Sequence, residues 1–171
     1  FQIKRLNENI SCKLIRGNVD TRLKKLKEGL YDAIILSLAG IKSLELEKEI
    51  TQIFLTNEII PSAGQGIICA QCKKNNYEII ELLNKINDSD TFKCAIAERD
   101  VLKILEGDCE TAVGVHAELK DNKITLEAEL FSLDGSKRFH EKITKDSTEY
   151  NKIGVEIGNN LKKQSKGDYK K

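Results

Sequence analysis

Apolar residues in the first part of the chain occur partly in continuous runs and partly at helical spacing. Residues 10–16 are typical of a strand, and residues 31–38 form an almost continuous apolar run that suits a central parallel strand. Leucines at helical spacing between them predict a helix that Asp20 caps and that ends near Gly29. Strand, helix and strand in this order form a βαβ unit, and residues 39–50 predict a further helix. This section therefore has the pattern of an α/β fold.

The middle of the chain begins with a loop and continues with helices. Residues 56–66 contain the only proline, Pro61, together with two glycines, which predicts a loop or hinge. A short strand is expected at 67–72. Apolar residues at helical spacing then predict two helices, over about 77–87 and 91–106.

The last part of the chain changes to alternation with a period of two residues. Strand-like stretches cover residues 111–119, 123–131 and 138–144, and turn-forming Asp, Asn and Gly residues separate them. A three-stranded antiparallel meander is the simplest arrangement. A final helix is expected over about 148–163, and the polar end, Ser165–Lys171, is expected to be frayed. The whole chain therefore predicts an α/β section followed by an α+β section with a small antiparallel sheet.

Composition excludes several classes of protein. An apolar share of 40% and a charged share of 32% exclude a disordered or collagen-like chain. Because 28 basic residues nearly balance 27 acidic ones, nucleic-acid binding driven by bulk charge is disfavoured. The longest apolar run is too short to cross a bilayer, and no signal peptide is recognisable. The chain has no methionine, so we expect it to be a processed or truncated part of something larger.

The five cysteines have no regular spacing, which favours reduced thiols in an intracellular compartment over a disulfide framework. Cys69 and Cys72 form a CxxC pair, but a strand would point them to opposite faces, and no further ligands have the spacing of a zinc site. We therefore expect no metal site. His116 and His140 lie in predicted strands and are expected to be ordinary surface or core residues.

Residues 16–22, with the sequence Arg-Gly-Asn-Val-Asp-Thr-Arg, are more informative. They lie where a predicted strand runs into a helix, which is where open α/β sheets bind ligands and where free backbone amides favour anions. Gly17 allows close approach of the backbone, and Arg16 and Arg22 can each clamp a carboxylate or phosphate. An ordinary turn with surface arginines explains the same residues.

Cys109 is the second candidate, in a loop that follows a predicted helix. Its neighbours Glu106, Asp108 and Glu110 disfavour the thiolate, which argues against a papain-like nucleophile. A thiol that captures a strong electrophile once and stays attached to it remains compatible with this setting. A lone cysteine that only packs is the alternative.

Several motifs occur together in a fixed order. They are residues 14–23 (LIRGNVDTRL), 28–36 (EGLYDAIIL) with Ala39-Gly40, 61–66 (PSAGQG), 97–99 (AER) and 105–109 (LEGDC). In order and spacing they resemble the porphobilinogen deaminase family, also called hydroxymethylbilane synthases. The resemblance covers most of residues 10–119.

The resemblance implies a three-domain transferase of tetrapyrrole and haem biosynthesis. It joins four porphobilinogens head to tail, releases ammonia at each addition and hydrolyses off the linear product. Residues 1–60 would be the C-terminal part of a middle α/β domain that is similar to periplasmic binding proteins. Residues 61–75 would form the hinge and a return strand towards the first domain, and 76–171 a cofactor-bearing α+β domain.

The resemblance also implies roles for individual residues. Cys109 would hold a dipyrromethane cofactor through a thioether, and the arginines would bind the carboxylates of the pyrrole chain. The residues expected to bind cofactor or substrate are Arg16, Gly17, Asn18, Thr21, Arg22 and Gln65. Asp108, Glu110 and Ser43 depart from the residues usual in the family.

The expected partners are porphobilinogen, the growing polypyrrole and the missing N-terminal half of the same enzyme, with no nucleic acid and no membrane. The family's catalytic aspartate belongs to that half, so no catalytic residue is expected here and the isolated chain should be inactive. The complete enzyme is expected to be a monomer in the cytoplasm or a plastid. A non-catalytic anion-binding α/β module that uses Arg16 and Arg22 is the alternative function.

Overall fold

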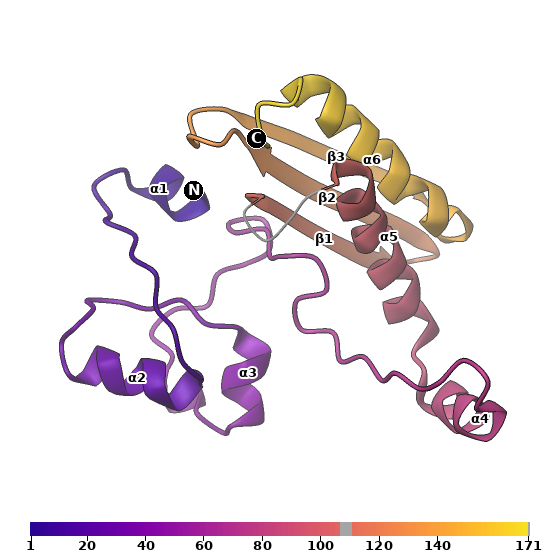
Figure 1. Cartoon of the computed structure of the whole chain (residues 1–171), viewed down its shortest axis with the longest axis horizontal. Coiled ribbons are helices and arrows are strands. Elements are labelled where there is room, and N and C mark those ends of the chain that lie inside the picture. Colours follow the sequence, from indigo (N-terminus) through magenta and orange to yellow (C-terminus); the bar gives the residue numbers. More distant parts are fainter. Residues whose placement is uncertain (107–110, 171) are drawn as a thin grey trace. The chain divides into compact units, whose positions relative to one another are not determined.

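The computed structural model describes residues 1–106 and 111–170 of the chain. The chain separates into an N-terminal unit, Phe1–Leu55, and a C-terminal unit, Thr56–Lys171 (Figure 1). Residues 61–75 belong to the C-terminal unit. The finer division at residues 60 and 75 remains a prediction. Among the described residues, no helix combines the length and the apolar character needed to span a membrane.

The N-terminal unit is built from short helices joined by extended chain. Its elements are α1 (Gln2–Leu6), α2 (Val19–Lys27), α3 (Leu38–Ser43) and the 3₁₀ turn η1 (Glu47–Glu49). Leu23 of α2 and Ile41 of α3 are its buried apolar residues. No strand forms anywhere in residues 1–55. The apolar core of this unit is therefore small.

The strands predicted at 10–16, 31–38 and 67–72 are wrong for this structure, because none of these segments has a hydrogen-bonded neighbour strand. The βαβ unit therefore does not form. Their apolar side chains are also uncovered, since Leu14 is 78% and Ile68 is 97% exposed. A β-strand needs a hydrogen-bonded neighbour strand as well as suitable side chains. The pattern of apolar positions indicates suitable side chains but not whether a neighbour strand is present.

Helix boundaries in the N-terminal unit are set by backbone conformation. Helix α2 is capped by Asn18, not by Asp20 as predicted. It ends at Lys27, close to the expected stop at Gly29, which has a φ of +73°. The amide of Leu30 donates to the Lys25 carbonyl at 3.1 Å, which closes the last turn. The helix predicted over 39–50 stops early, because Glu45 has a φ of +56° that an α-helix cannot contain.

The C-terminal unit is a three-stranded antiparallel meander with helices. Strand β1 pairs with β2 and β2 with β3, so the order is β1-β2-β3. Asp121 and Asn122, with φ of +51° and +58°, form the tight turn between β1 and β2 that the sequence predicted. The elements are α4 (Tyr77–Ile86), α5 (Ser89–Leu105), β1 (Val113–Lys120), β2 (Lys123–Phe131), β3 (Arg138–Asp146), η2 (Ser147–Glu149) and α6 (Tyr150–Ser165). The α+β prediction for this section is confirmed.

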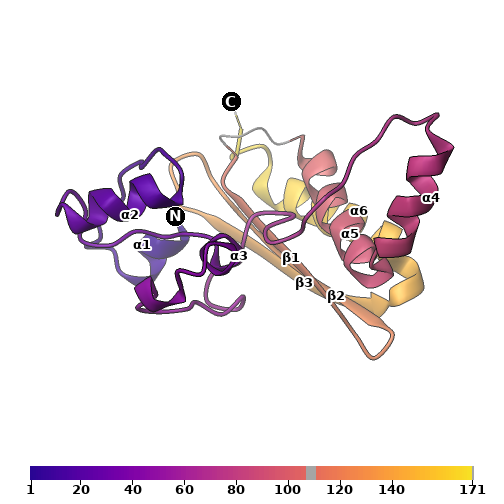
Figure 2. The same cartoon turned by 90° about the horizontal axis from the view of Figure 1, so that it is seen from below.

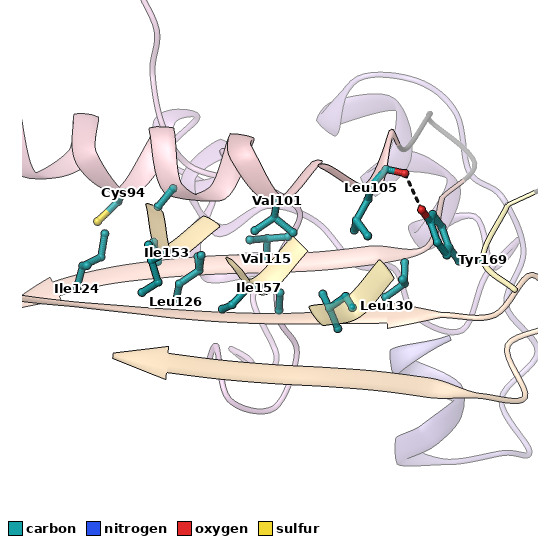
Figure 3. Packing of buried hydrophobic residues seen from close by; sticks show 14 residues of the cluster. Cys94, Val101, Leu105, Val115, Ile124, Leu126, Leu130, Ile153, Ile157 and Tyr169 are labelled. Carbon is teal, nitrogen blue, oxygen red and sulfur yellow. Dashed lines mark hydrogen bonds between the residues drawn. The ribbon is translucent and has the colours of Figure 1, made fainter. Parts of the chain in front are cut away.

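Helices α5 and α6 pack side by side on one face of the sheet (Figure 1). The core lies between these helices and the sheet (Figure 3). In contrast, α4 contributes no buried residue and lies away from the sheet (Figure 2). Glycine allows the close approach of α5 and α6, because a Cβ at Gly154 would lie 2.2 Å from the Ala97 carbonyl oxygen. The core residues include Val101, Leu105, Val115, Ile124, Leu126, Leu130, Ile153, Ile157 and Leu161.

The end of the chain is part of this core, so the prediction of a frayed tail is wrong for residues up to 170. Tyr169 is only 1% exposed, and its hydroxyl donates to the Leu105 carbonyl at 2.8 Å (Figure 3). The amide of Leu133 donates to the Asp168 carbonyl at 2.9 Å. Tyr169 thus anchors the polar C-terminal segment to the core. The composition of this segment alone does not distinguish it from a free end.

Candidate functional site

The turn that precedes α2 holds most of the predicted binding residues. The Asn18 side-chain oxygen accepts hydrogen bonds from the Thr21 amide at 2.9 Å and the Thr21 hydroxyl at 2.7 Å, and so caps the helix. Gly17 has a φ of +122°, and a Cβ there would come within 2.8 Å of Thr21 Cγ2. The turn therefore requires glycine at this position, both for its conformation and for space.

Cationic side chains brace the same turn from the helix side. Arg22 Nε donates to the Gly17 carbonyl at 2.8 Å, and Lys25 Nζ donates to the Arg16 carbonyl at 2.9 Å. The carbonyl oxygens of the turn are thereby already occupied, while the basic groups remain close to them. Asp20 is the acidic residue in the first turn of the helix. The balance of charge around the turn is positive.

The chemistry available at this turn is recognition of a carboxylate or another anion. In the part of the chain that the structure describes, the exposed Arg16 guanidinium has no hydrogen-bond partner and is available to a ligand. Arg22 uses only Nε on the turn, which leaves its terminal amino groups as donors. Asn18 and Thr21 direct their oxygens at each other. Their contribution is therefore mainly to shape the turn.

Gln65 lies in a different setting, in the C-terminal unit. It is exposed and stands between Gly64 and Gly66, which have φ of +77° and +83°. The backbone amide of Gln65 donates to the Ser62 carbonyl at 3.0 Å and closes a tight turn, which leaves the Gln65 side chain exposed to solvent. This loop belongs to the C-terminal unit, whereas the turn that precedes α2 belongs to the N-terminal unit.

Cys109 lies outside the described residues, but helix α5, which precedes it, is described to its end. The last carbonyls of α5 are held by groups from the end of the chain, because Lys162 Nζ donates to Ile104 at 3.2 Å and Tyr169 to Leu105. Hydrogen bonds from Lys170 and Lys162 lower the pKa of Glu106, which caps the helix. Sequence reasoning missed these contacts, although Tyr169 stands out as the aromatic residue in a polar tail.

The remaining cysteines lie in several different settings. Cys12, Cys69, Cys72 and Cys94 are free, and no group of His, Cys, Asp or Glu in residues 1–106 and 111–170 could hold a metal ion. Burial, with a smaller contribution from the Glu98 carboxylate, raises the pKa of the Cys94 thiol to about 11. Cys94 is therefore a protonated core residue at neutral pH.

Family comparisons cover nearly all of the chain. A family profile described as "Porphobilinogen deaminase, dipyromethane cofactor binding domain" matches residues 1–81, and a second, "Porphobilinogen deaminase, C-terminal domain", matches residues 92–163. The chain belongs to the porphobilinogen deaminase family. Residues 16–22, called the arginine turn below, lie in the first matched range, which is the cofactor-binding domain of the family. Cys109 lies in the second matched range.

Individual relatives agree with this family assignment. A protein of Francisella philomiragia named porphobilinogen deaminase is 43% identical over 145 residues, which are 85% of this chain and 48% of that protein. Proteins of the same name from Syntrophobacter fumaroxidans and Coxiella burnetii are 36% and 38% identical over 94% and 95% of this chain. The match covers 52% and 53% of their own lengths. The chain spans about half the length of the curated relatives it matches.

Proposed function

We propose that this chain works as the C-terminal portion of a porphobilinogen deaminase that polymerises four porphobilinogens into hydroxymethylbilane. The observation that carries the proposal is the match of both family profiles in one order along the chain. In each addition, the aminomethyl carbon of one porphobilinogen forms a bond to a pyrrole α-carbon, and the carbon–nitrogen bond breaks. Ammonia leaves with the proton that the pyrrole loses, and water finally releases the linear product.

The arginine turn fits a polycarboxylate ligand. By the family resemblance, each pyrrole carries an acetate and a propionate group, so a chain of pyrroles needs several cations around it. Arg16 is exposed and Arg22 is oriented by its bond to the Gly17 carbonyl, and a guanidinium held in place binds a carboxylate with two parallel hydrogen bonds. These two side chains would hold carboxylates of the cofactor and the substrate. By the same resemblance, Gln65 would also be a residue that binds the pyrrole chain.

Cys109 is the residue we propose to carry the dipyrromethane cofactor, as a thioether. When bound, this group supplies the free pyrrole α-carbon to which the first porphobilinogen is joined. The acidic character of the neighbouring residues is compatible with this role, because the thiol has to react only once and is not a recurring nucleophile. The chain itself then orients the pyrroles and neutralises their carboxylates.

The extended segments of the N-terminal unit support the proposal that residues 1–60 complete a larger α/β domain. Leu14, Ile35 and Ile53 are 78%, 55% and 54% exposed, although they lie in apolar runs suited to buried strands. Strands contributed by the other half of a longer protein would cover them and supply the missing hydrogen-bond partners. On this proposal the domain has the periplasmic-binding-protein type of sheet.

A non-catalytic anion-binding module is the second candidate. The arginine turn favours this candidate, because Gly17, Arg22 and Lys25 form an anion-attracting turn within the N-terminal unit alone. Such a module would bind inorganic phosphate or a simple dicarboxylate as well as a pyrrole. An enzyme of the proposed class would require the specific substrate.

The experiment that tests the proposal measures hydroxymethylbilane formation from porphobilinogen. The protein made from the complete gene is expected to form the product with release of ammonia, and the isolated 171-residue chain is expected to form none. Arg16→Gln should lower kcat/KM by at least about tenfold, because a charge-assisted pair with a substrate carboxylate is lost. Lys24→Gln removes one charge from an exposed site on α2, the helix that follows the turn, and should change kcat/KM little. If the complete protein forms no hydroxymethylbilane, the proposal is overturned.

A further inference from the structure

Helix α5 carries a buried carboxylate that the proposed chemistry does not use. Glu98 is 4% exposed, and it belongs to the Ala-Glu-Arg motif at 97–99. Its Oε2 accepts a hydrogen bond from the Gly64 amide at 2.7 Å, and its Oε1 accepts one from the Ala117 amide at 2.8 Å. Two titratable groups lie near it: His116, whose Nδ1 is 3.8 Å from Oε1, and the Cys94 thiol, whose pKa the Glu98 carboxylate raises. One carboxylate thus joins a helix, a strand and a loop.

The loop concerned is Pro61–Gly66, which runs along the free edge of β1. The Val115 amide donates to the Pro61 carbonyl at 2.7 Å, so the loop satisfies a backbone donor that the edge strand would otherwise expose. The Gly64 amide then points to Glu98. Gln65 follows directly, at the tip of the turn between the two glycines of positive φ. The loop is therefore attached on the side of Pro61 and Gly64 and presents Gln65.

The cost of burying Glu98 indicates that its contacts matter. A buried carboxylate is unfavourable unless hydrogen bonds compensate it. The other buried residues of α5, Cys94, Ala97, Val101 and Leu105, carry no charge, and an apolar residue at position 98 would avoid this cost. Both compensating donors are backbone amides of other segments, and neither is needed to form α5 itself. The carboxylate therefore serves the segments that it joins.

We propose that Glu98 is a positioning residue that holds the Pro61–Gly66 loop, and with it Gln65, against the edge of β1. The contact to the loop is independent of the enzyme's activity. The effect on the reaction rests on the proposed function, since it requires that Gln65 contact the pyrrole chain.

The contact is tested by amide hydrogen exchange in the 171-residue chain. Because hydrogen bonds to a charged acceptor are among the stronger ones, Glu98→Ala should speed exchange at Gly64 and Ala117 by at least about tenfold. Exchange in the β2–β3 ladder should stay the same. Glu98→Gln keeps one acceptor oxygen and should free one of the two amides. The matched control is Glu118→Gln, which changes an exposed carboxylate on β1, next to Ala117. Unchanged exchange at Gly64 would overturn the proposal.

A measurement on the unsubstituted chain protects the test against a variant that does not fold. In the unsubstituted chain the amides of Gly64 and Ala117 should both be protected from hydrogen exchange, because both donate to Glu98. Exchange of the Gly64 amide as fast as in an unstructured peptide would contradict the shared contact.

The effect on the reaction is tested by a double-mutant cycle in the protein made from the complete gene. If Glu98 acts through Gln65, Glu98→Gln combined with Gln65→Ala should reduce kcat/KM no further than Gln65→Ala alone. Effects that multiply would show that Glu98 is only structural and would overturn the positioning role. If the unsubstituted protein forms no bilane, the proposed function fails, whereas the amide exchange still decides the loop contact.

Discussion

The hydroxyl of Tyr169 donates a hydrogen bond of 2.8 Å to the carbonyl of Leu105, the last residue of α5. A residue at the end of the chain thereby caps the helix that leads to Cys109. Lys162 and Lys170 add positive charge at the same helix end, where the helix dipole favours cations. The C-terminal segment is therefore a part of the C-terminal unit that fixes where α5 ends.

Loss of this hydrogen bond should destabilise the C-terminal unit. Tyr169→Phe keeps the ring in the core but leaves the buried Leu105 carbonyl without the phenol, and we expect a loss of about 1–2 kcal/mol in the free energy of unfolding. Urea denaturation followed by circular dichroism measures it. Tyr77→Phe changes a tyrosine that is 75% exposed and should have no effect. Equal stability of both variants would contradict the capping role.

Deletion of residues 166–171 should cost more than the single hydrogen bond. It removes the whole Tyr169 ring from the core, which corresponds to about 3 kcal/mol or more. Deletion of Lys170 and Lys171 alone removes an exposed ion pair to Glu106 and should change the stability little. A scan of unfolding temperatures compares the two truncations. A frayed end would give the same temperature for both.

The contact of α5 with α6 predicts that alanine is harmful at Gly154. Alanine normally stabilises a helix relative to glycine by about 1 kcal/mol. Here its Cβ would lie 2.2 Å from the Ala97 carbonyl oxygen, so the helices would have to move apart. We expect Gly154→Ala to destabilise the unit by about 2 kcal/mol or more, measured by urea denaturation. Asn159→Ala, at an exposed position of α6, should be neutral or stabilising.

Burial of Cys94 predicts a pH dependence of stability in the alkaline range. Burial, then the Glu98 carboxylate, raises the pKa of the thiol from 9.0 to about 11. Because the folded state holds this proton more tightly, the contribution is complete below pH 9 and is lost as the pH rises towards 11. The stability difference between the unsubstituted chain and Cys94→Ala should therefore shrink over that range, as chemical denaturation at several pH values would show. Cys12→Ala, an exposed change, is the control; a constant difference would contradict the assignment.

The sequence predicted the C-terminal unit well because its elements find their partners within the chain. The β1–β2–β3 meander follows from alternation and from the turn at Asp121 and Asn122, which are local signals. The N-terminal strands failed for the opposite reason. The apolar run at 31–38 describes a strand that needs neighbours, and none pairs with it in residues 1–55. Apolar pattern alone does not supply a hydrogen-bond partner.

The candidate site was predictable in its residue types but not in its internal contacts. Arg16 and Arg22 are visible in the sequence as basic residues around a glycine turn. The bond of Arg22 to the Gly17 carbonyl, and the choice of Asn18 over Asp20 as the helix cap, depend on backbone conformation. The role of Glu98 was invisible for a similar reason, because Gly64 and Ala117 are far from it in sequence.

The most direct test of the account is the mass of the peptide that contains Cys109, taken from the protein made from the complete gene. Peptide mapping by mass spectrometry should find this cysteine carrying a covalent dipyrromethane that gives a colour with Ehrlich reagent. The adduct should be absent from Cys109→Ala and present in Cys94→Ala. An unmodified Cys109 in protein that forms hydroxymethylbilane would contradict the account.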